Sequence, residues 1–335
     1  MRLSLLALAL LASSARADDV PEPELPSPDE TFAKKYSATK AAEYLDAVGV
    51  NWTRDRKCIT CHTNMPYLTA RPLLPGDAGW KEVRAFLVKD VESWAEGKKP
   101  RGPAYVVATA FALSFHDAQR GTELHPATRV ALDRMFDPTR KPREWNWLKC
   151  EWPPLEHDDY YGATLAALAI GYAPGDYAKT PKARAAIEKL KGYFKTVPPP
   201  DLHHTAMLLW ASTKLPGLMT ADQREKAVAA LKAKQRKDGG WSLPSLGSYK
   251  RRDKEKTPND PNADSDGYGT GFATFVLLQA GAKPTDDTVV SAVKWLKANQ
   301  RASGRWYTRS LNNDKDHYIT NAGTAFCVLA LDAFK

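Results

Sequence analysis

Residues 58–62 read Cys-Ile-Thr-Cys-His, which is the C-x-x-C-H spacing of covalent haem attachment. Two thiols at this spacing can add to the two vinyl groups of one haem, and the adjacent imidazole can bind its iron. The chain has only four cysteines and seven histidines, so chance is a poor explanation for this order. We therefore interpret Cys58, Cys61 and His62 as a haem c site, with His62 as the iron ligand.

Cys58 and Cys61 also fit two other roles. In an exported protein the pair can form a disulfide or a redox pair, and two cysteines can supply half of a zinc site. The second axial ligand of a haem is open too. Met65 is too close in sequence to reach the opposite face of the haem, and five-coordinate iron is an alternative. The candidates for this ligand are Met135, His203, His204, Met207 and His317.

A second group of reactive side chains lies at the starts of apolar segments. Its members are His157, Asp158, Asp159 and Tyr161; Asp201, His203 and His204; Asp264, Asp266 and Tyr268; and Asp316, His317 and Tyr318. The aspartates are candidate acids or metal ligands, and His157, His203 and His317 are candidate metal ligands. The alternative is structural, because Asp201, Asp264 and Asp316 suit the N-cap position of a helix.

The first 17 residues predict an export signal. Arg2 precedes the apolar run 3–11, and Ala15-Arg16-Ala17 has the small-x-small pattern of a cleavage site. That run is too short to span a membrane, and no later stretch approaches the roughly 20 apolar residues that a span requires. We expect an exported protein, periplasmic or secreted, that begins near Asp18 and has no stable membrane span.

The composition, with 43% hydrophobic residues, allows a large buried core. The formal charge of +9 falls to +7 without Arg2 and Arg16. Part of the remaining charge lies in the run 250–256, which acidic residues interrupt and which we interpret as a solvated loop. No nucleic-acid-binding module is recognisable. Residues 18–35 contain four prolines and predict an extended linker.

Six apolar segments rich in small residues recur along the chain. They span residues 66–73, 105–115, 160–170, 203–212, 268–279 and 318–333. Between them lie more polar segments with apolar residues at helical spacing, such as 183–194, 224–234 and 288–299. About six helical hairpins of this kind bury their surfaces if they curve into a closed ring. We expect residues 36–335 to form one all-α domain, an α/α toroid with inner and outer helices and with C-x-x-C-H at its first inner helix.

Two motifs in the last third of the chain resemble the Q-x-x-x-G-x-W repeat of squalene-hopene and oxidosqualene cyclases. The first contains Leu231, Gln235, Gly239 and Trp241, and the second contains Leu296, Gln300, Gly304 and Trp306. Ala230 and Ser291 depart from the repeat, where an aromatic and a basic residue are usual. In each motif we expect a helix to end near the glutamine, the glycine to allow a left-handed turn, and the tryptophan to stack beside the glutamine amide.

The resemblance implies the α/α toroid of terpene cyclases and protein prenyltransferases, with a large apolar funnel that opens where the inner helices begin. It does not transfer an activity. The D-x-D-D acid motif of the cyclases is absent, because Gly267 follows Asp264-Ser265-Asp266. The Asp-Cys-His zinc set of the prenyltransferases is incomplete as well. Asp266 and His317 match two of its members, but Tyr268 stands where the cysteine belongs.

The remaining cysteines differ in their surroundings. Cys327 lies in an apolar segment and is expected to be buried. Cys150 lies in the segment 145–152, whose three tryptophans predict a loop packed over the mouth of the barrel. In a cyclase-like enzyme, Trp145, Trp147 and Tyr161 would shield cationic intermediates.

Three functions fit these residues. The first is an exported haem protein with a redox or electron-transfer role and a redox partner. The second is an enzyme similar to terpene cyclases or prenyltransferases that uses Asp158, Asp159, Asp264 or Asp266. The third is a non-catalytic scaffold for an apolar small molecule or a metal, with zinc as the alternative to haem. We favour the first because of the C-x-x-C-H motif.

Overall fold

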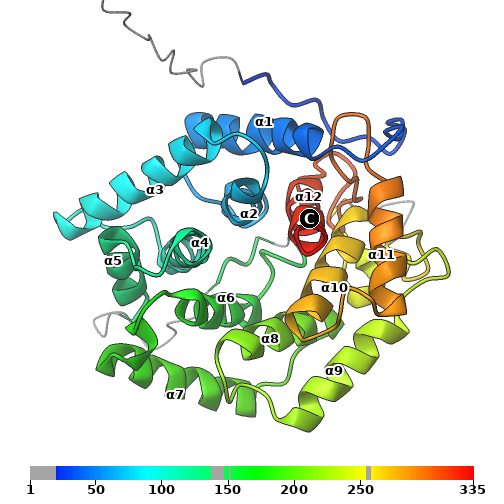
Figure 1. The fold of residues 1–335 in the computed structure, drawn as a ribbon. Coiled ribbons are helices and arrows are strands. Elements are labelled where there is room, and N and C mark those ends of the chain that lie inside the picture. The colour runs from blue at the N-terminus through cyan, green and yellow to red at the C-terminus, as the bar shows by residue number, and fades with distance from the viewer. Residues whose placement is uncertain (1–19, 137–146, 151, 254–257) are drawn as a thin grey trace, which may run out of the picture.

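The chain folds into two concentric rings of α-helices, seen end-on in the computed structural model of Figure 1. The structure describes residues 20–136, 147–150, 152–253 and 258–335. The outer ring contains α1 (Ala38–Arg56), α3 (Ala78–Ala95), α5 (Pro126–Met135), α7 (Pro181–Thr196), α9 (Ala221–Ala233) and α11 (Asp287–Ala298). The inner ring contains α2 (Asn64–Ala70), α4 (Pro103–Arg120), α6 (Asp159–Tyr172), α8 (Leu202–Lys214), α10 (Gly267–Gln279) and α12 (Ile319–Asp332).

This architecture confirms the predicted all-α toroid. Each of the six apolar segments lies in an inner helix, with 66–73 divided between α2 and the short 3-10 helix η2 (Arg71–Leu73). Two further 3-10 helices, η3 (Tyr177–Lys179) and η4 (Leu243–Leu246), lie in connections. Among the described residues, β-structure is limited to two isolated bridges, Phe32 with Arg301 and Trp152 with Glu156.

The difference between the rings follows from the distribution of apolar residues. In the outer helix α7 the buried residues are Ala183, Ala186, Leu190 and Phe194, which form one stripe at helical spacing. In the inner helix α10 all residues from Gly267 to Leu277 are buried. A helix that is apolar on all sides is stable in water only when it is surrounded, so these segments form the inner ring.

Contacts between α12 and α2, and between α12 and α1, close the ring between its last and first hairpins. The second Q-x-x-x-G-x-W motif lies at this closure. The side-chain amide of Gln300 donates to the carbonyls of Gly304 (2.9 Å) and Ser37 (3.0 Å), and its oxygen accepts from the N–H of Ser37 (2.7 Å). Because Ser37 is the N-cap of α1, the glutamine ties the end of α11 to the start of the chain's first helix.

The first motif makes the matching contacts within the ring. Gln235 donates to the carbonyls of Gly239 and Thr288, each at 2.8 Å. The indole nitrogens of Trp241 and Trp306 donate to carbonyls of the preceding outer helices, each at 2.8 Å. Both indoles are fully buried. The glycines have left-handed φ angles of 92° at Gly239 and 98° at Gly304, as the sequence predicts.

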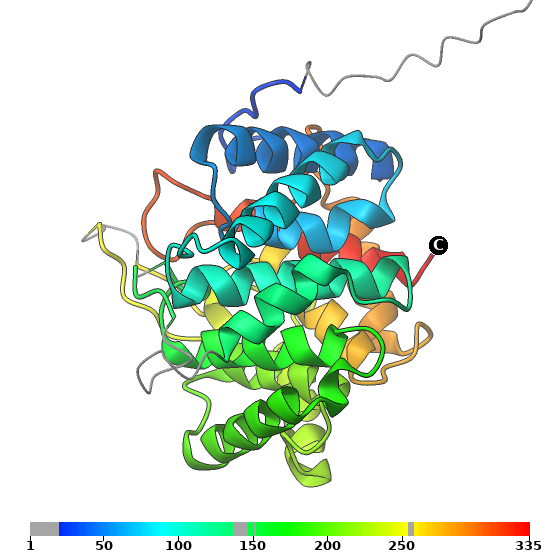
Figure 2. The same cartoon turned by 90° about the vertical axis from the view of Figure 1, so that its left-hand side faces the viewer.

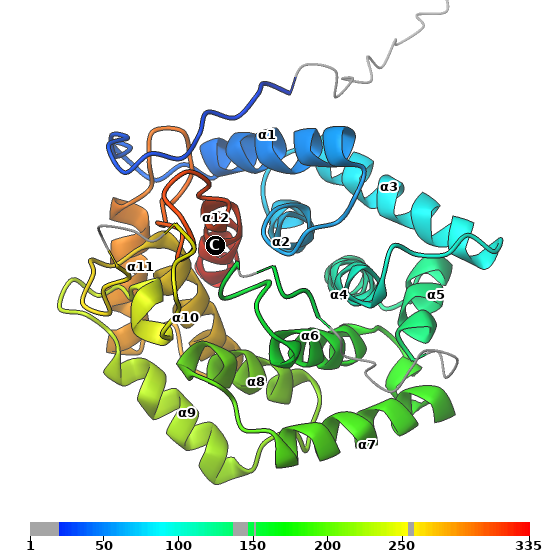
Figure 3. The ribbon, with the colours of Figure 1, turned by 180° about the vertical axis from the view of Figure 1, so that it is seen from behind.

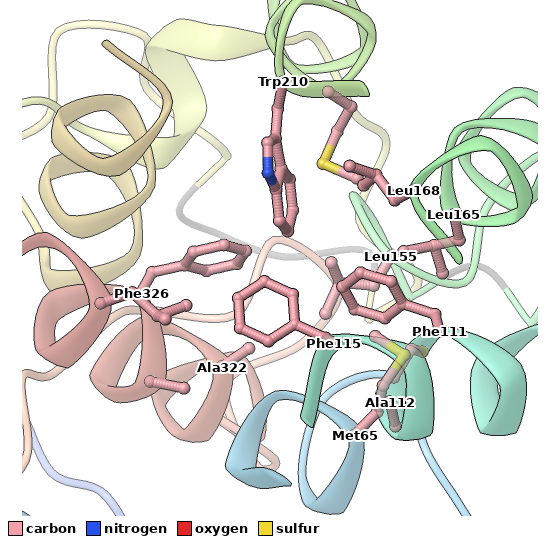
Figure 4. Packing of buried hydrophobic residues seen from close by; sticks show 14 of the residues in the cluster. Met65, Phe111, Ala112, Phe115, Leu155, Leu165, Leu168, Trp210, Ala322 and Phe326 are labelled. Carbon is pink, nitrogen blue, oxygen red and sulfur yellow. The ribbon is translucent and has the colours of Figure 1, made fainter. Parts of the chain in front are cut away.

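Aromatic and aliphatic side chains fill the centre of the ring. Phe111, Phe115, Trp210 and Phe326 point toward one another from α4, α8 and α12 (Figure 4). The hollow that remains, lined by Cys61, Met65 and Trp210 among others, has a volume of about 10 Å³. Small-molecule pockets usually enclose about 300–1,000 Å³. The large apolar funnel implied by the resemblance is therefore absent from the centre of this structure, because large side chains occupy that space.

Residues 20–35 are extended and lie against the toroid. Glu30 pairs with Arg305 (2.5 Å), whose side chain is 2% exposed, and Arg305 also donates to the carbonyl of Glu24. The N–H of Ala33 donates to the carbonyl of Gln300 (2.7 Å). These contacts hold this segment beside the turn between α11 and α12.

The basic run 250–256 differs in part from the expected solvated loop. The Arg251 side chain is 4% exposed and pairs with Asp253 (2.8 Å) and Asp314 (2.9 Å). A planar guanidinium can bind several oxygens at once, and these contacts offset the cost of removing its charge from water. Lys250 and Arg252 are exposed, as expected, and Lys254 and Lys256 lie outside the described residues. None of the described helices combines the length and the apolar character needed to cross a bilayer.

Candidate functional site

The inner helices begin at the same end of the toroid. Figure 3 looks onto this end, where loops cross the opening, and Figure 2 shows that the C-terminus lies on the opposite side. The residues that precede α2, α6, α8, α10 and α12 therefore surround one mouth, as the sequence predicts.

The C-x-x-C-H loop lies at this mouth, between α1 and α2. The fully buried side chain of Asn64 holds it in place. Its oxygen accepts from the N–H of Thr60 (2.8 Å), and its nitrogen donates to the carbonyl of Cys58 (2.8 Å) and to the hydroxyl of Thr53 (3.0 Å). One amide thus shapes the loop between the two cysteines.

His62 lies between two aromatic rings at the edge of the mouth. Its imidazole stacks on Tyr318, with ring centroids 5.0 Å apart, and meets Trp52 edge-on at 5.0 Å. Nδ1 lies 2.7 Å from the hydroxyl of Thr63, which accepts from the amide of Asn321 (3.1 Å). Burial lowers the pKa of His62 to about 4, so the ring is neutral at pH 7.

The four cysteines are unpaired thiols. Cys58 is half-buried, whereas Cys61 is 2% exposed and its Sγ donates to Oε1 of Glu156 (2.8 Å). Burial and the Glu156 carboxylate raise the pKa of the Cys61 thiol, and burial raises the pKa of Glu156. Cys327 is buried, as predicted, and donates to the carbonyl of Gly267 (3.1 Å).

Among the described residues, none of the histidine candidates for a second axial ligand makes a ring contact or a hydrogen bond with His62. Met135 lies in the outer helix α5, and Met207 is buried within α8. His317 accepts a hydrogen bond from the N–H of Ser310 (3.0 Å) through Nδ1. His203 and His204 belong to a separate cluster, described below. The rings in contact with His62 are Trp52 and Tyr318.

The segment before α6 crosses the mouth, as its tryptophans predict. The Trp147 indole donates to the carbonyl of Leu155, which is buried at the centre of the ring (Figure 4). Trp152 packs against Tyr318 with centroids 5.9 Å apart. Glu156, the partner of Cys61, belongs to this segment. Trp145, which would shield cationic intermediates in a cyclase-like enzyme, lies outside the described residues.

The four candidate catalytic aspartates have different surroundings. Asp158 caps α6 and accepts from the N–H of Tyr161 (3.1 Å), whereas Asp159 accepts from the N–H of Trp147 and pairs with Lys149, both at 3.0 Å. Asp264 is exposed. Asp266 caps α10 and accepts from two backbone N–H groups and a threonine hydroxyl; burial raises its pKa to about 6 against these hydrogen bonds. None of the four lines the central hollow.

The N-cap predictions are correct at one position and wrong at two. Asp201 caps α8 by accepting from the N–H of His204 (2.9 Å). Asp264 lies two residues before the cap of α10, which is Asp266. Asp316 also precedes its helix, because α12 begins at Ile319 and Tyr318 takes the cap position without a side-chain hydrogen bond. The cap residues lie two positions after the predicted aspartates because residues 260–266 and 313–318 form turns through their own side chains.

Asp201, His203 and His204 lie together at the start of α8. They place one potential metal-ligand atom each within 4.8 Å of one another, and in the described part of the chain no other group of three or more His, Cys, Asp or Glu residues does so. The other predicted metal ligands, His157, His317 and Asp266, are not members of this group. Among the described residues, Asp266 and His317 are therefore not grouped with a third potential ligand of the prenyltransferase-like set.

His204 lies between two carboxylates. Its Nδ1 is 2.7 Å from Oδ1 of Asp201, and its Nε2 is 2.9 Å from Oδ2 of Asp158 at an angle unsuited to a hydrogen bond. Burial lowers the pKa of His204, but these two carboxylates outweigh it and raise the pKa to about 9. Burial and the His204 charge lower the pKa of the neighbouring His203 to about 3.

Several members of these networks had no signal in the sequence. Glu156, Asn64 and Tyr249 follow no motif, and Glu156 and Tyr249 meet their partners through packing of distant segments. Tyr249 donates to Oδ2 of Asp201 (2.6 Å) across 48 positions, and Glu156 meets Cys61 across 95. Only the fold brings such residues together.

Comparison with known families extends the resemblance seen in the repeats. Residues 201–331 match the model of the squalene-hopene cyclase C-terminal domain. This part runs from the N-cap of α8 into α12 and includes both Q-x-x-x-G-x-W motifs. A search among curated proteins finds no match. The fold is thus squalene-hopene-cyclase-like, and its α/α toroid defines the class of architecture.

Proposed function

We propose that this chain is an exported protein that carries one covalent haem c and transfers electrons. Cys58 and Cys61 would form the two thioether bonds, and Nε2 of His62 would bind the iron. A haem held in this way supplies one-electron redox chemistry. The observation that carries the proposal is the donor set of residues 58–62. It consists of two unpaired thiols and a neutral imidazole whose Nδ1 is already held by a hydroxyl.

The surroundings of the loop support this assignment over the alternatives. The sulfurs of Cys58 and Cys61 are not joined in a disulfide. No third His, Cys, Asp or Glu among the described residues completes a metal-ligand group with them, which a structural zinc site would need. Thr63 holds Nδ1 of His62, as the outer partners of ligating histidines do.

Two features set conditions on haem attachment. The Cys61 thiol has to leave the carboxylate of Glu156 before its sulfur bonds to carbon. The central hollow of about 10 Å³ cannot contain the macrocycle. The haem would therefore lie at the mouth, on the side where Cys58 and His62 are only half-buried.

A cyclase-like activity has less support, although residues 201–331 match that family. The filled centre offers no space for an isoprenoid chain. Asp266 is the nearest counterpart of the cyclase acid. Its carboxylate oxygens accept hydrogen bonds from the backbone N–H groups of Leu243 and Gly269 and from the hydroxyl of Thr308. We therefore place the chemistry at the C-x-x-C-H loop.

The test is a pyridine haemochrome spectrum of the full chain, expressed with its N-terminal segment and a c-type maturation system, after acid-acetone extraction. The wild type should keep a c-type band, and Cys58→Ala with Cys61→Ala should abolish it. Cys150→Ala is the matched control, because it removes an exposed thiol outside the pentad and should keep the band. A wild type without covalent haem contradicts the proposal. Export is tested separately by recovering the protein from the periplasm and sequencing its N-terminus, which should lie near Asp18.

A further inference from the structure

The cluster at the start of α8 has the composition of a metal centre. Two imidazoles and one carboxylate come from three residues within one turn, Asp201, His203 and His204. Both histidines are 0% exposed. Their potential ligand atoms and that of Asp201 lie within 4.8 Å of one another. This arrangement is independent of the C-x-x-C-H loop, from which no residue joins it.

Each of the three side chains is also held from behind. Nε2 of His203 lies 2.8 Å from the hydroxyl of Tyr268, and Nε2 of His204 lies 2.9 Å from Oδ2 of Asp158. The hydroxyl of Tyr249 donates to Oδ2 of Asp201 (2.6 Å). Metal-binding histidines and carboxylates are usually oriented by such outer partners, which fix the ring and its tautomer. These contacts leave Nδ1 of His203 free. Nδ1 of His204 and Oδ1 of Asp201 contact each other at 2.7 Å, so a cation that replaces the proton between them would meet all three atoms.

The Nδ1 atom of His203 is the observation that a purely structural role does not explain. It is buried and has no hydrogen-bond partner. An unsatisfied buried polar atom costs about 1–3 kcal/mol, and native proteins seldom contain one without a reason. The ion pairs with Asp158 and Asp201 explain why His204 is buried, but they give no partner to Nδ1 of His203. A bound cation would satisfy Nδ1 of His203 as well.

We propose that Asp201, His203 and His204 bind a divalent transition-metal ion through Oδ1 of the aspartate and Nδ1 of the two histidines, and that the ion replaces the proton between Nδ1 of His204 and Oδ1 of Asp201, which is released to solvent. Two imidazoles and one carboxylate suit zinc or ferrous iron. Three protein ligands leave a coordination position for water or a small molecule, which is typical of Lewis-acid sites. The site lies at the same mouth as the haem loop, but its existence does not depend on haem attachment.

Zinc titration of the EDTA-treated full chain by calorimetry, with the metal content of the dialysed protein, tests the proposal. The wild type should bind one zinc ion per chain. His203→Gln should weaken binding by more than about 100-fold, and Tyr268→Phe, which removes an outer partner, by about 10–100-fold. Equal affinity in the wild type and His203→Gln, or no stoichiometric zinc in the wild type, overturns the proposal.

Two controls separate this site from the others. Cys58→Ser with Cys61→Ser removes the thiols of the pentad, and His317→Gln removes the histidine of the prenyltransferase-like set; both variants should keep one zinc ion. If His203→Gln fails to fold by circular dichroism, the absorption spectrum of the cobalt-substituted wild type decides the question. It should show ligand-field bands without a thiolate charge-transfer band, and a thiolate band would overturn the assignment. Failure of zinc binding leaves the haemochrome result unaffected, so the two proposals fail separately.

Discussion

Asn64 illustrates how a single buried side chain shapes the C-x-x-C-H loop. Its amide makes four hydrogen bonds, to Thr53, Cys58 and Thr60, which join the end of α1 to the backbone between the two cysteines. Water does not reach the oxygen or the nitrogen of this amide, because the residue has no exposed surface. The loop that presents Cys58 and His62 is therefore part of the folded core rather than an independent surface turn.

Replacement of Asn64 by alanine should lower the free energy of unfolding of the haem-free protein by about 2–4 kcal/mol. The variant loses four hydrogen bonds and leaves the N–H of Thr60 and the carbonyl of Cys58 without partners. Urea denaturation followed by circular dichroism measures the difference. Asn262→Ala, in an exposed turn, is the control and should change the free energy by less than about 0.5 kcal/mol. Equal stabilities of the two variants would show that the loop is held by other contacts.

At the scale of elements, the Q-x-x-x-G-x-W motifs act as joints between neighbouring hairpins. In both motifs the glutamine amide bonds to the turn and to the next outer helix in the ring, and the tryptophan bonds back to the helix before it. Glycine is needed in each turn because the backbone of the next outer helix lies too close for a Cβ atom. A Cβ at Gly304 would lie 2.1 Å from the carbonyl oxygen of Lys40 in α1, and one at Gly239 would lie 2.7 Å from that of Ser291 in α11.

A pair of glycine variants separates the strain of the turn from the contact between helices. Gly97 has φ 105° and nothing within 4 Å of a Cβ, whereas Gly304 has φ 98° and the backbone of α1 in the way. Gly97→Ala should cost about 1–2 kcal/mol for the left-handed conformation alone. Gly304→Ala should cost about 1–3 kcal/mol more, because α1 must move. Thermal and urea unfolding of both variants measures the difference, and equal losses would refute the close contact as the reason for glycine at residue 304.

At the scale of the whole molecule, the ring is closed by more than its helices. The segment 20–35 lies against the turn between α11 and α12, and its Glu30 is the ionic partner of the buried Arg305. Hydrogen bonds from Ser303 and Arg305 lower the pKa of Glu30 against the opposing effect of burial. A segment that resembles a linker in composition thus contributes to the core at the point where the first and last hairpins meet.

Glu30→Ala should destabilise the protein by about 3–5 kcal/mol, because it leaves the guanidinium of Arg305 buried without its ion pair. Replacing both residues, as Glu30→Met with Arg305→Met, should restore much of this loss, because no unpaired charge remains. Urea unfolding of Glu30→Met, Arg305→Met and the double variant gives the coupling energy. A double variant as unstable as the sum of the single ones would indicate that the pair does not interact.

The sequence alone determined the architecture and the grouping of the C-x-x-C-H residues. Helical spacing and C-x-x-C-H are local patterns, so the alternating inner and outer helices and the grouping of Cys58, Cys61 and His62 needed no knowledge of distant contacts. The left-handed turns at Gly239 and Gly304 were predictable for the same reason.

The tertiary structure alone decided what surrounds these residues. The helix caps are residues later than the predicted Asp264 and Asp316. Aromatic side chains fill the space of the expected funnel, and Cys61 is hydrogen-bonded to Glu156. The partners of the α8 cluster, Asp158, Tyr249 and Tyr268, come from separate parts of the ring. Distances between residues far apart in the chain depend on how whole helices pack, and a local sequence pattern does not contain that information.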